Sequence, residues 1–353
     1  MRGGSHRLLA PWFRILRDPF LVVQIAGWLL VGGGLVFLAR AQEGVSAPAP
    51  ASPAVITPVR PIPVQPDKVR LGERLFGDTR LSGSGKLACT SCHDLSRGGS
   101  DDQARPEASG DMHDYNALTV FNAAYNFRMN WRGNARTLEE QNNAVITDPR
   151  FMGGDWGEIL KKLAADQGYR AALTTIYGPR WSKADVLDAL AEFQRSLVTP
   201  DSRFDRYLRG EQGAITAAEE RGFRLFESYG CVACHQGRNI GGNLFQKFGI
   251  FTDPFSGRTP AMAADLGRYT LTGREEDRFV FRVPSLRNVA LTAPYFHDGG
   301  IRRLDEAVAI MARTQLGREL PPHEVELIVR FLQTLTGEYN GRPLDQDAGR
   351  GAP

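Results

Sequence analysis

Apolar side chains recur at intervals of three and four residues in several segments of the chain, a spacing typical of amphipathic helices. The spacing predicts helices at residues 69–76, 156–167, 183–197, 217–227, 304–312 and 323–335. Thr216 and Glu219 stand three residues apart, as in a capping box, and Ser182 is a candidate N-cap. Long runs that alternate between apolar and polar residues are scarce, so we expect a mainly α fold.

An approximate internal repeat divides the chain. The sequence Arg-Leu-Phe occurs at residues 74–76 and again at 224–226, each time inside a predicted helix and shortly before a cysteine. We therefore expect two similar domains, at residues 67–205 and 206–340, joined near residues 201–210 and followed by a flexible tail at 341–353.

The N-terminal region indicates export. Residues 20–39 carry no charged side chain and, at about 1.5 Å per residue, can cross a bilayer core of about 30 Å. Four preceding arginines favour a cytoplasmic N-terminus. The segment is either an anchor or a signal peptide cleaved near Ala41, and both place residues 42–353 outside the cytoplasmic membrane. Residues 42–66, rich in Ala and Pro, predict an extended linker.

Composition narrows the function classes. The 353 residues are 42% hydrophobic and 24% charged, which is ordinary for a globular protein. The formal net charge is +3, and no basic stripe follows the N-terminal segment. The chain therefore lacks the charge pattern of a nucleic-acid-binding protein.

All four cysteines belong to Cys-x-x-Cys-His motifs, the attachment signature of c-type haem. In this motif both thiols add to the haem vinyl groups and the histidine is the proximal iron ligand. A zinc site needs four ligands close together, whereas these motifs lie far apart in the sequence. A redox dithiol would need a βαβ context that the chain lacks. We therefore predict two covalently bound haems, attached through Cys89, Cys92 and His93 and through Cys231, Cys234 and His235.

Four other stretches carry a family resemblance. They are Thr-Val-Phe-Asn-Ala at 119–123, Phe-Asp-Arg-Tyr-Leu at 204–208, Pro-Ser-Leu-Arg-Asn-Val-Ala at 284–290 and Leu-Thr-Ala-Pro-Tyr-Phe-His-Asp-Gly at 291–299. With the haem motifs, residues 67–340 resemble the bacterial di-haem cytochrome c peroxidase family. Its superfamily includes the enzyme that matures the tryptophan-derived quinone of methylamine dehydrogenase. The resemblance implies two cytochrome c-like haem domains and a homodimer.

The resemblance also implies roles for single residues. His93 would be the proximal ligand of a low-potential haem where peroxide reacts, and His235 that of a high-potential haem where electrons enter. Met311 falls at the position of the family's axial methionine, which raises the haem potential, although a core position is the alternative. Trp131 matches the tryptophan between the haems, and Gln141 matches the glutamine of the peroxide pocket.

A calcium site between the domains is implied as well. Asn116, Thr292 and Pro294 match the family's calcium ligands, and oxygen ligands suit this hard cation. His297 lies in the same matching stretch, away from the axial positions, and we expect it to make a structural hydrogen bond.

Two departures from the family pattern concern the peroxide pocket. Phe151 stands where the family has a glutamate that moves a proton during O–O cleavage, and the nearest substitutes are Asp148 and Asp155. Loss of such acid–base help typically costs about 10²–10⁴-fold in rate. Ala108 stands where many family members have a mobile-loop histidine, so His113 is a displaced haem ligand, a pocket residue or a surface residue.

Three functions remain open on this basis. The first is a periplasmic peroxidase that reduces hydrogen peroxide with electrons from a small c-type cytochrome or cupredoxin. The second is a di-haem enzyme that oxidises a residue of a partner protein, and the third is a membrane-tethered cytochrome that only transfers electrons. Met311 favours the first function, Phe151 opposes it, and His113 as a permanent ligand would favour the third.

Overall fold

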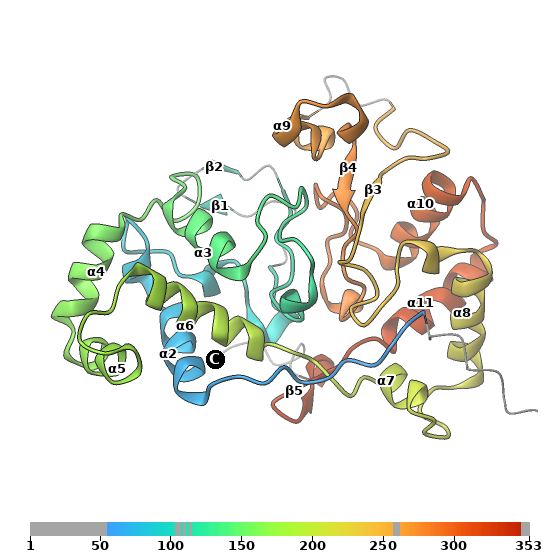
Figure 1. Ribbon diagram of the computed structural model, residues 1–353. Helices are drawn as coiled ribbons and strands as arrows, with labels where there is room; N and C mark the ends of the chain where they lie inside the picture. The colour runs from blue at the N-terminus through green and yellow to red at the C-terminus, as the bar shows by residue number, and fades with distance from the viewer. Residues whose placement is uncertain are drawn as a thin grey trace, which may run out of the picture. The chain divides into compact units, whose positions relative to one another are not determined.

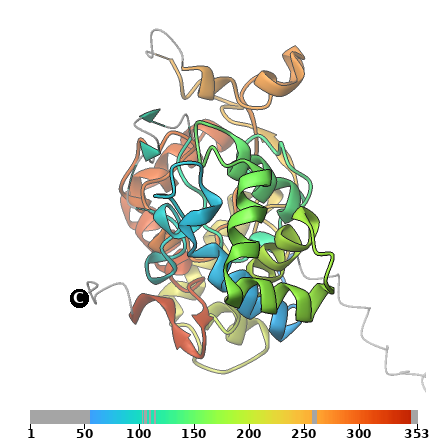
Figure 2. The same cartoon turned by 90° about the vertical axis from the view of Figure 1, so that its left-hand side faces the viewer.

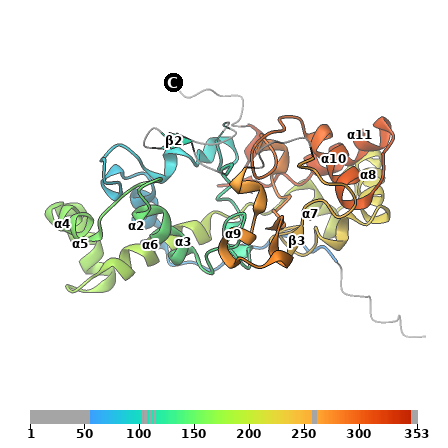
Figure 3. The ribbon, with the colours of Figure 1, turned by 90° about the horizontal axis from the view of Figure 1, so that it is seen from above.

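Helices provide most of the regular structure, as the sequence predicts (Figure 1). The computed structural model describes residues 55–101, 103, 107–108, 111–112, 115–256 and 262–346. In Figures 1 and 3, helices α2 to α6 form one group, and α8, α10 and α11 form another. The α-helices are α2 (Pro66–Phe76), α3 (Leu138–Thr147), α4 (Trp156–Ala165), α5 (Gln167–Tyr177), α6 (Lys183–Ser196), α7 (Arg203–Leu208), α8 (Ala217–Ser228), α9 (Tyr269–Thr272), α10 (Leu304–Leu316) and α11 (Pro322–Gln333).

Short antiparallel hairpins supply the strands of the described residues. They pair β1 (Glu107–Ala108) with β2 (Asp111–Met112), β3 (Phe245–Lys247) with β4 (Val280–Arg282), and β5 (Glu338–Tyr339) with β6 (Arg342–Pro343). The β3–β4 hairpin lies between the two helix groups in Figure 1. The connection between these two strands carries α9, and it projects above both groups in Figure 2.

The first helix group is built on the crossing of α2 and α6. Leu75 of α2 and Leu190 and Phe193 of α6 are at most 2% exposed and share one hydrophobic core. Gly72 allows the close approach, because a Cβ there would lie 2.0 Å from the carbonyl oxygen of Ala189. The two backbones therefore touch where a side chain would keep them apart.

The second helix group repeats this arrangement with α8 and α11. The rings of Phe226 and Phe331 have centroids 5.3 Å apart within a second hydrophobic core. A Cβ on Gly222 would lie 1.9 Å from the carbonyl oxygen of Leu327. Gly72 and Gly222 each stand two residues before an Arg-Leu-Phe sequence, so the internal repeat extends to the glycine that permits each crossing.

Replacing Gly72 by alanine is expected to lower the free energy of unfolding by about 1–3 kcal/mol, because the added methyl group meets backbone that cannot rotate away. Urea unfolding followed by far-UV circular dichroism measures the change. Gly77→Ala is the control, since its Cβ would meet nothing closer than the carbonyl oxygen of Arg74, at 4.0 Å. Equal stability of the two variants would contradict the close crossing.

Three predicted segments differ from the structure. The helix predicted at 156–167 ends at Ala165, because the Asp166 side chain accepts a hydrogen bond from the N–H of Tyr169 at 2.9 Å and starts a separate helix, α5, at Gln167. The helix predicted at 304–312 continues to the end of α10, where Gly317 adopts φ +63°. The link predicted at 201–210 contains α7, whose Phe204 and Asp205 are fully buried.

Both predicted N-terminal caps are confirmed. The N–H of Glu219 donates to the Thr216 hydroxyl at 3.3 Å, and the N–H of Thr216 donates to the Glu219 carboxylate at 2.7 Å. The N–H and hydroxyl of Ser182 donate to the Asp185 carboxylate at 2.8 and 2.9 Å. Local sequence therefore determines where α6 and α8 begin.

The two ends of the described chain pack on opposite helix groups. Ile56 is 4% exposed in the core of the second group, and the N–H of Val59 donates to Asp205 at 3.1 Å. Leu344 is 4% exposed in the core of the first group, just after the β5–β6 hairpin. Within the predicted linker and tail, the described residues 55–66 and 341–346 are thus partly packed, because each stretch contributes apolar side chains to a core. The rest of both segments lies outside the described residues, and their roles stay predictions.

Some predictions concern residues beyond this description. The expected anchor or signal peptide at residues 20–39 lies outside the described residues. In the part that the structure describes, no helix is both long and apolar enough to cross a membrane. The domain division at residues 205 and 206 stays a prediction, and α7 spans that boundary.

Candidate functional site

Two cavities are lined by the two Cys-x-x-Cys-His motifs. Their volumes are about 360 Å³ and about 400 Å³, within the usual range for small-molecule and cofactor sites. In each cavity both thiols and the imidazole of one motif belong to the lining, as covalent haem attachment requires. These side chains are Cys89, Cys92 and His93 in the first cavity and Cys231, Cys234 and His235 in the second.

A single turn of backbone places each histidine beside the first cysteine of its motif. The N–H of His93 donates to the carbonyl oxygen of Cys89 at 3.0 Å, and the N–H of His235 donates to that of Cys231 at 2.9 Å. The short spacing of the motif therefore folds so that all its reactive groups reach one cavity.

His93 is oriented for metal binding. Its Nδ1 lies 3.1 Å from the carbonyl oxygen of Gly99, which selects the tautomer that leaves Nε2 as the ligand atom. Burial lowers the pKa of His93, against a smaller opposing effect of the Gly99 carbonyl. A neutral imidazole with a fixed ring is the form that binds haem iron.

His235 has a similar environment without that hydrogen bond. Its buried Nδ1 has no hydrogen-bond partner of normal geometry, although the backbone carbonyls of Ile240 and Pro284 lie nearby. Burial lowers the pKa of His235 to about 4, and these carbonyls oppose the shift. The ring is therefore neutral at physiological pH.

Three of the four thiols have raised pKa values, which suit thioether formation better than thiolate chemistry. All four are free, and burial raises the pKa of Cys89 to about 12 and the pKa values of Cys92 and Cys231 to about 11. A thiol that stays protonated is a poor zinc ligand and a poor exchange nucleophile. The residues present therefore fit haem c, whose attachment leaves both sulfurs uncharged.

The internal repeat places one phenylalanine beside each histidine. The ring centroid of Phe76 lies 6.5 Å from that of His93, and Phe226 lies 6.4 Å from His235. These are the phenylalanines of the two Arg-Leu-Phe sequences. Each helix that carries an Arg-Leu-Phe sequence therefore packs beside its own motif.

Trp131 belongs to the lining of both cavities. It is 9% exposed, and its Nε1 donates to the carbonyl oxygen of Asn116 at 2.9 Å. The N–H of Arg282 donates to the carbonyl oxygen of Trp131 at 2.8 Å. The indole is thus held where it lines both candidate haem sites, and its predicted place between two bound haems stays a prediction.

Met311 lies on α10 and lines the second cavity together with His235. It is half-buried and does not belong to either main hydrophobic core. This placement agrees with an axial ligand better than with a core residue. Its ligation stays a prediction.

The predicted peroxide pocket lies in the first cavity. Gln141 and Phe151 both line it, and Gln141 accepts a hydrogen bond from the side chain of Asn130. The phenyl ring of Phe151 therefore stands in the cavity where the family resemblance implies a carboxylate.

Of the two substitutes proposed for that carboxylate, only Asp148 lines the cavity. Its Oδ2 lies 2.7 Å from Nη2 of Arg150, which also lines the cavity. Asp155 instead caps α4 by accepting the N–H of Glu158 at 3.1 Å. The structure thus leaves Asp148 as the candidate proton donor.

The three residues expected to bind calcium all line the second cavity. The Asn116 side chain lies 2.6 Å from the carbonyl oxygen of Pro294, and Asn116 and Thr292 line the second cavity. Within the described residues, no group of three or more His, Cys, Asp or Glu side chains converges on a metal position. A calcium ion here would therefore depend on amide and backbone oxygens, and it stays a prediction.

The sequence also predicts roles for His297 and His113, and of these two the structure describes only His297. His297 is buried, and its Nε2 lies 2.8 Å from Oδ1 of Asp265, which confirms the expected structural hydrogen bond. Its ring stacks on Phe281 with centroids 4.7 Å apart. His113 lies outside the described residues, so all three of its proposed roles stay predictions.

Sequence reasoning missed Arg282. It lines both cavities and is 2% exposed. The sequence feature that could have pointed to it is its position, two residues before the stretch that begins at Pro284 and resembles the family.

Several known proteins are similar to this chain in sequence or in fold. The family model described as di-haem cytochrome c peroxidase matches residues 66–213. A cytochrome c551 peroxidase of Nitrosomonas europaea is 41% identical over 307 residues, which cover 86% of this chain and 90% of that protein. A cytochrome c peroxidase of Escherichia coli is 41% identical over 296 residues, which cover 82% of this chain and 63% of that protein.

Among solved structures, a MauG-like protein associated with microbial copper homeostasis is similar with a TM-score of 0.69 and 31% identity. The match covers 83% of this chain and 96% of that protein. The expectation drawn from the resembling stretches is confirmed, and the chain belongs to the di-haem cytochrome c peroxidase family, a family of oxidoreductases.

Proposed function

We propose that the chain is a periplasmic di-haem cytochrome c peroxidase. It would reduce hydrogen peroxide to water with electrons from a small c-type cytochrome or a cupredoxin. The observation that carries the proposal is the position of Trp131, which lines both motif-bearing cavities. An aromatic side chain shared by two cofactor cavities suits electron transfer between them.

The second cavity is the proposed electron-accepting site. His235 and Met311 line it together and would be the two axial ligands there. Two protein ligands leave no open position for peroxide, and a thioether ligand raises the haem potential. Both properties suit a site that receives electrons and passes them on.

The first cavity is the proposed peroxide site. A haem bound there would supply the iron at which peroxide accepts two electrons. His93 is fixed by Gly99, and the amide of Gln141 can orient peroxide. The Asp148 carboxylate can accept a proton from peroxide and pass it to the leaving oxygen. Arg150 holds the Asp148 carboxylate at 2.7 Å.

Further partners extend this proposal. Calcium would bind at Asn116, Thr292 and Pro294 and connect the 292–297 loop to Trp131, whose Nε1 donates to Asn116. The protein would work as a homodimer on the periplasmic side of the cytoplasmic membrane. Residues 20–39 would anchor it there, unless cleavage near Ala41 releases it.

One observation favours a second function, the oxidation of a residue on a partner protein. Phe151 lines the first cavity in place of the family's proton-moving glutamate. A site that transferred protons poorly would cleave peroxide slowly. Such a site would suit the slow oxidation of a residue on a partner protein better than rapid peroxide turnover.

Steady-state peroxide consumption by the purified, half-reduced protein distinguishes these functions, with a reduced c-type cytochrome as donor. We expect rapid turnover by the wild type and less than about tenfold gain in Phe151→Glu, since Asp148 already supplies a carboxylate. Slow turnover by the wild type with a large gain in Phe151→Glu would instead favour oxidation of a partner protein.

A further inference from the structure

Arg282 is a buried cation without a protein counter-charge. Its side chain is 2% exposed at the end of β4. Of the carboxylates that the structure describes, none lies within ion-pair distance of it. An uncompensated buried charge is strongly unfavourable, so such a group requires a partner in the functional protein.

A second buried arginine, Arg287, has a carboxylate partner that compensates its charge. Arg287 is 1% exposed, and its Nη2 lies 2.7 Å from Oδ1 of Asp205, which is itself fully buried. This ion pair lies outside both cavities. Arg282 differs in both respects, because it lacks a carboxylate and lines both cavities.

The hydrogen bonds of Arg282 use only part of its guanidinium. Nε donates to the carbonyl oxygen of Asn130 at 3.1 Å, and Nη1 lies 3.3 Å from both the Asn126 side-chain oxygen and the Val283 carbonyl oxygen. All three acceptors are neutral. Nη2 makes no hydrogen bond to any residue that the structure describes, so two of the five guanidinium N–H donors are left for a ligand.

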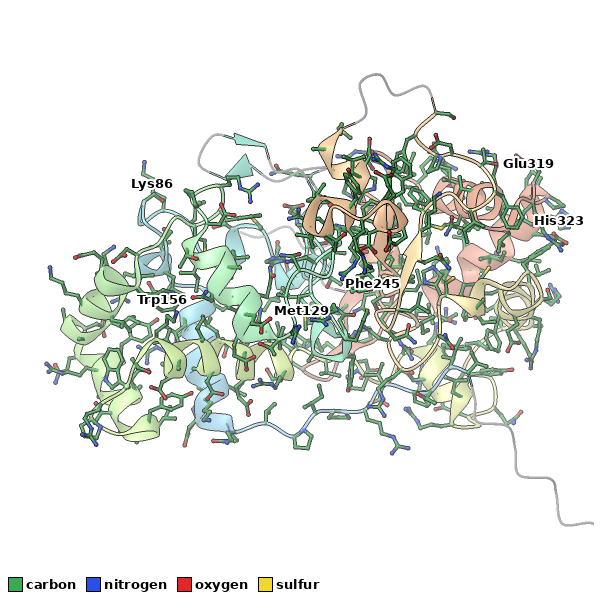
Figure 4. All side chains as sticks on the ribbon, turned by 45° about the horizontal axis from the view of Figure 1, so that its top comes forward. Lys86, Met129, Trp156, Phe245, Glu319 and His323 are labelled. Atoms are coloured by element: carbon green, nitrogen blue, oxygen red, sulfur yellow. The ribbon has the colours of Figure 1, made fainter. Side chains whose placement is uncertain are left out.

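Two backbone contacts fix the position of Arg282. Phe245, labelled in Figure 4, is its partner in the β3–β4 ladder. Its backbone N–H donates to Trp131 at 2.8 Å. Burial lowers the pKa of Arg282 to about 10, which leaves the guanidinium charged at neutral pH.

We propose that Arg282 binds a haem propionate carboxylate at the partition between the two cavities. Haem brings carboxylates into cavities that Arg282 lines, and a guanidinium pairs with a carboxylate through parallel hydrogen bonds. The pair satisfies Nη2 and neutralises both buried charges. It also places a cation beside Trp131, where electrons pass in the proposed function. The inference rests on that function only through the presence of haem.

The test is a spectroelectrochemical titration of the holoprotein as wild type, Arg282→Gln and Arg282→Met. Removal of a cation beside a haem disfavours the added electron. We expect the equilibrium constant for reduction of at least one haem to fall by about tenfold, which is about 59 mV for one electron. Arg282→Met provides an apolar chain of similar length if the glutamine variant does not fold.

Arg268→Gln is the matched control. Arg268 lies in the connection between β3 and β4, but Asp277 already lies 3.5 Å from its Nε, and Arg268 lines neither cavity. We expect its potentials to equal those of the wild type. Haem content is measured in parallel, so absence of haem would overturn the proposed function. Two bound haems with unchanged potentials in both Arg282 variants, or an equal shift in Arg268→Gln, would overturn this inference alone.

Discussion

Asp148→Asn is expected to lower the steady-state rate of peroxide consumption by about 10²–10⁴-fold, the usual contribution of a positioned general acid or base. Asp148 is the candidate carboxylate in the lining of the first cavity, and Phe151 occupies the position at which the family resemblance implied one. The amide retains the size of the side chain and cannot release a proton. The loss should therefore appear in the reaction with peroxide and not in haem content.

Asp155→Asn is the control for this variant. Asp155 caps α4 outside the cavity, and asparagine is an equally good N-cap, so both stability and turnover should persist. A structural role for the Asp148–Arg150 pair would change stability and leave the pH–rate profile intact. Full turnover in Asp148→Asn with an unchanged pH–rate profile would rule out proton transfer by this carboxylate.

Met311→Leu is expected to lower the midpoint potential of the haem in the second cavity by on the order of 0.1 V or more, within the roughly 0.8 V span that axial ligands control. Leucine matches methionine in volume but offers no sulfur. If Met311 were only a packing residue, the exchange would cost less than about 1.5 kcal/mol of stability and leave the potential unchanged.

A spectroelectrochemical titration with donor-dependent turnover on the same sample checks this expectation. The lower potential should slow electron uptake from a reduced cytochrome, so turnover falls with the potential. Met129→Leu is the matched control, because Met129 is buried and lines only the first cavity. A normal potential for the second-cavity haem in Met311→Leu would exclude Met311 as its ligand.

Local patterns in the sequence predicted the features that depend on neighbouring residues. Three such features lie within a few consecutive positions. They are the apolar spacing of each helix, the cap formed by Thr216 and Glu219, and each of the two haem motifs. The contact of Phe76 with His93 also followed, because the repeat places a helix just before each motif. The boundary at Asp166 was missed, since a residue that ends one helix while capping the next leaves the apolar periodicity almost unbroken.

Features that depend on distant segments could not be predicted in the same way. Gly72 looks like an ordinary surface glycine until the carbonyl of Ala189 is known to lie against it. Arg282 looks like one arginine among many until its burial and its lack of a carboxylate partner are seen. Both properties arise from tertiary packing, and neither has a fixed spacing in the sequence.

Each end of the described chain packs on the helix group that is farther from it in the sequence, and this arrangement affects the order of folding. Leu344 completes the core of the first group, and the ring of Tyr339 lies 5.0 Å from that of Phe121. A polypeptide that emerges N-terminus first cannot make these contacts until residues 339–344 have been synthesised. Ile56 likewise waits for the second group before it is buried. Such contacts between distant segments slow folding, and they make residues 339–344 necessary for completing the first core.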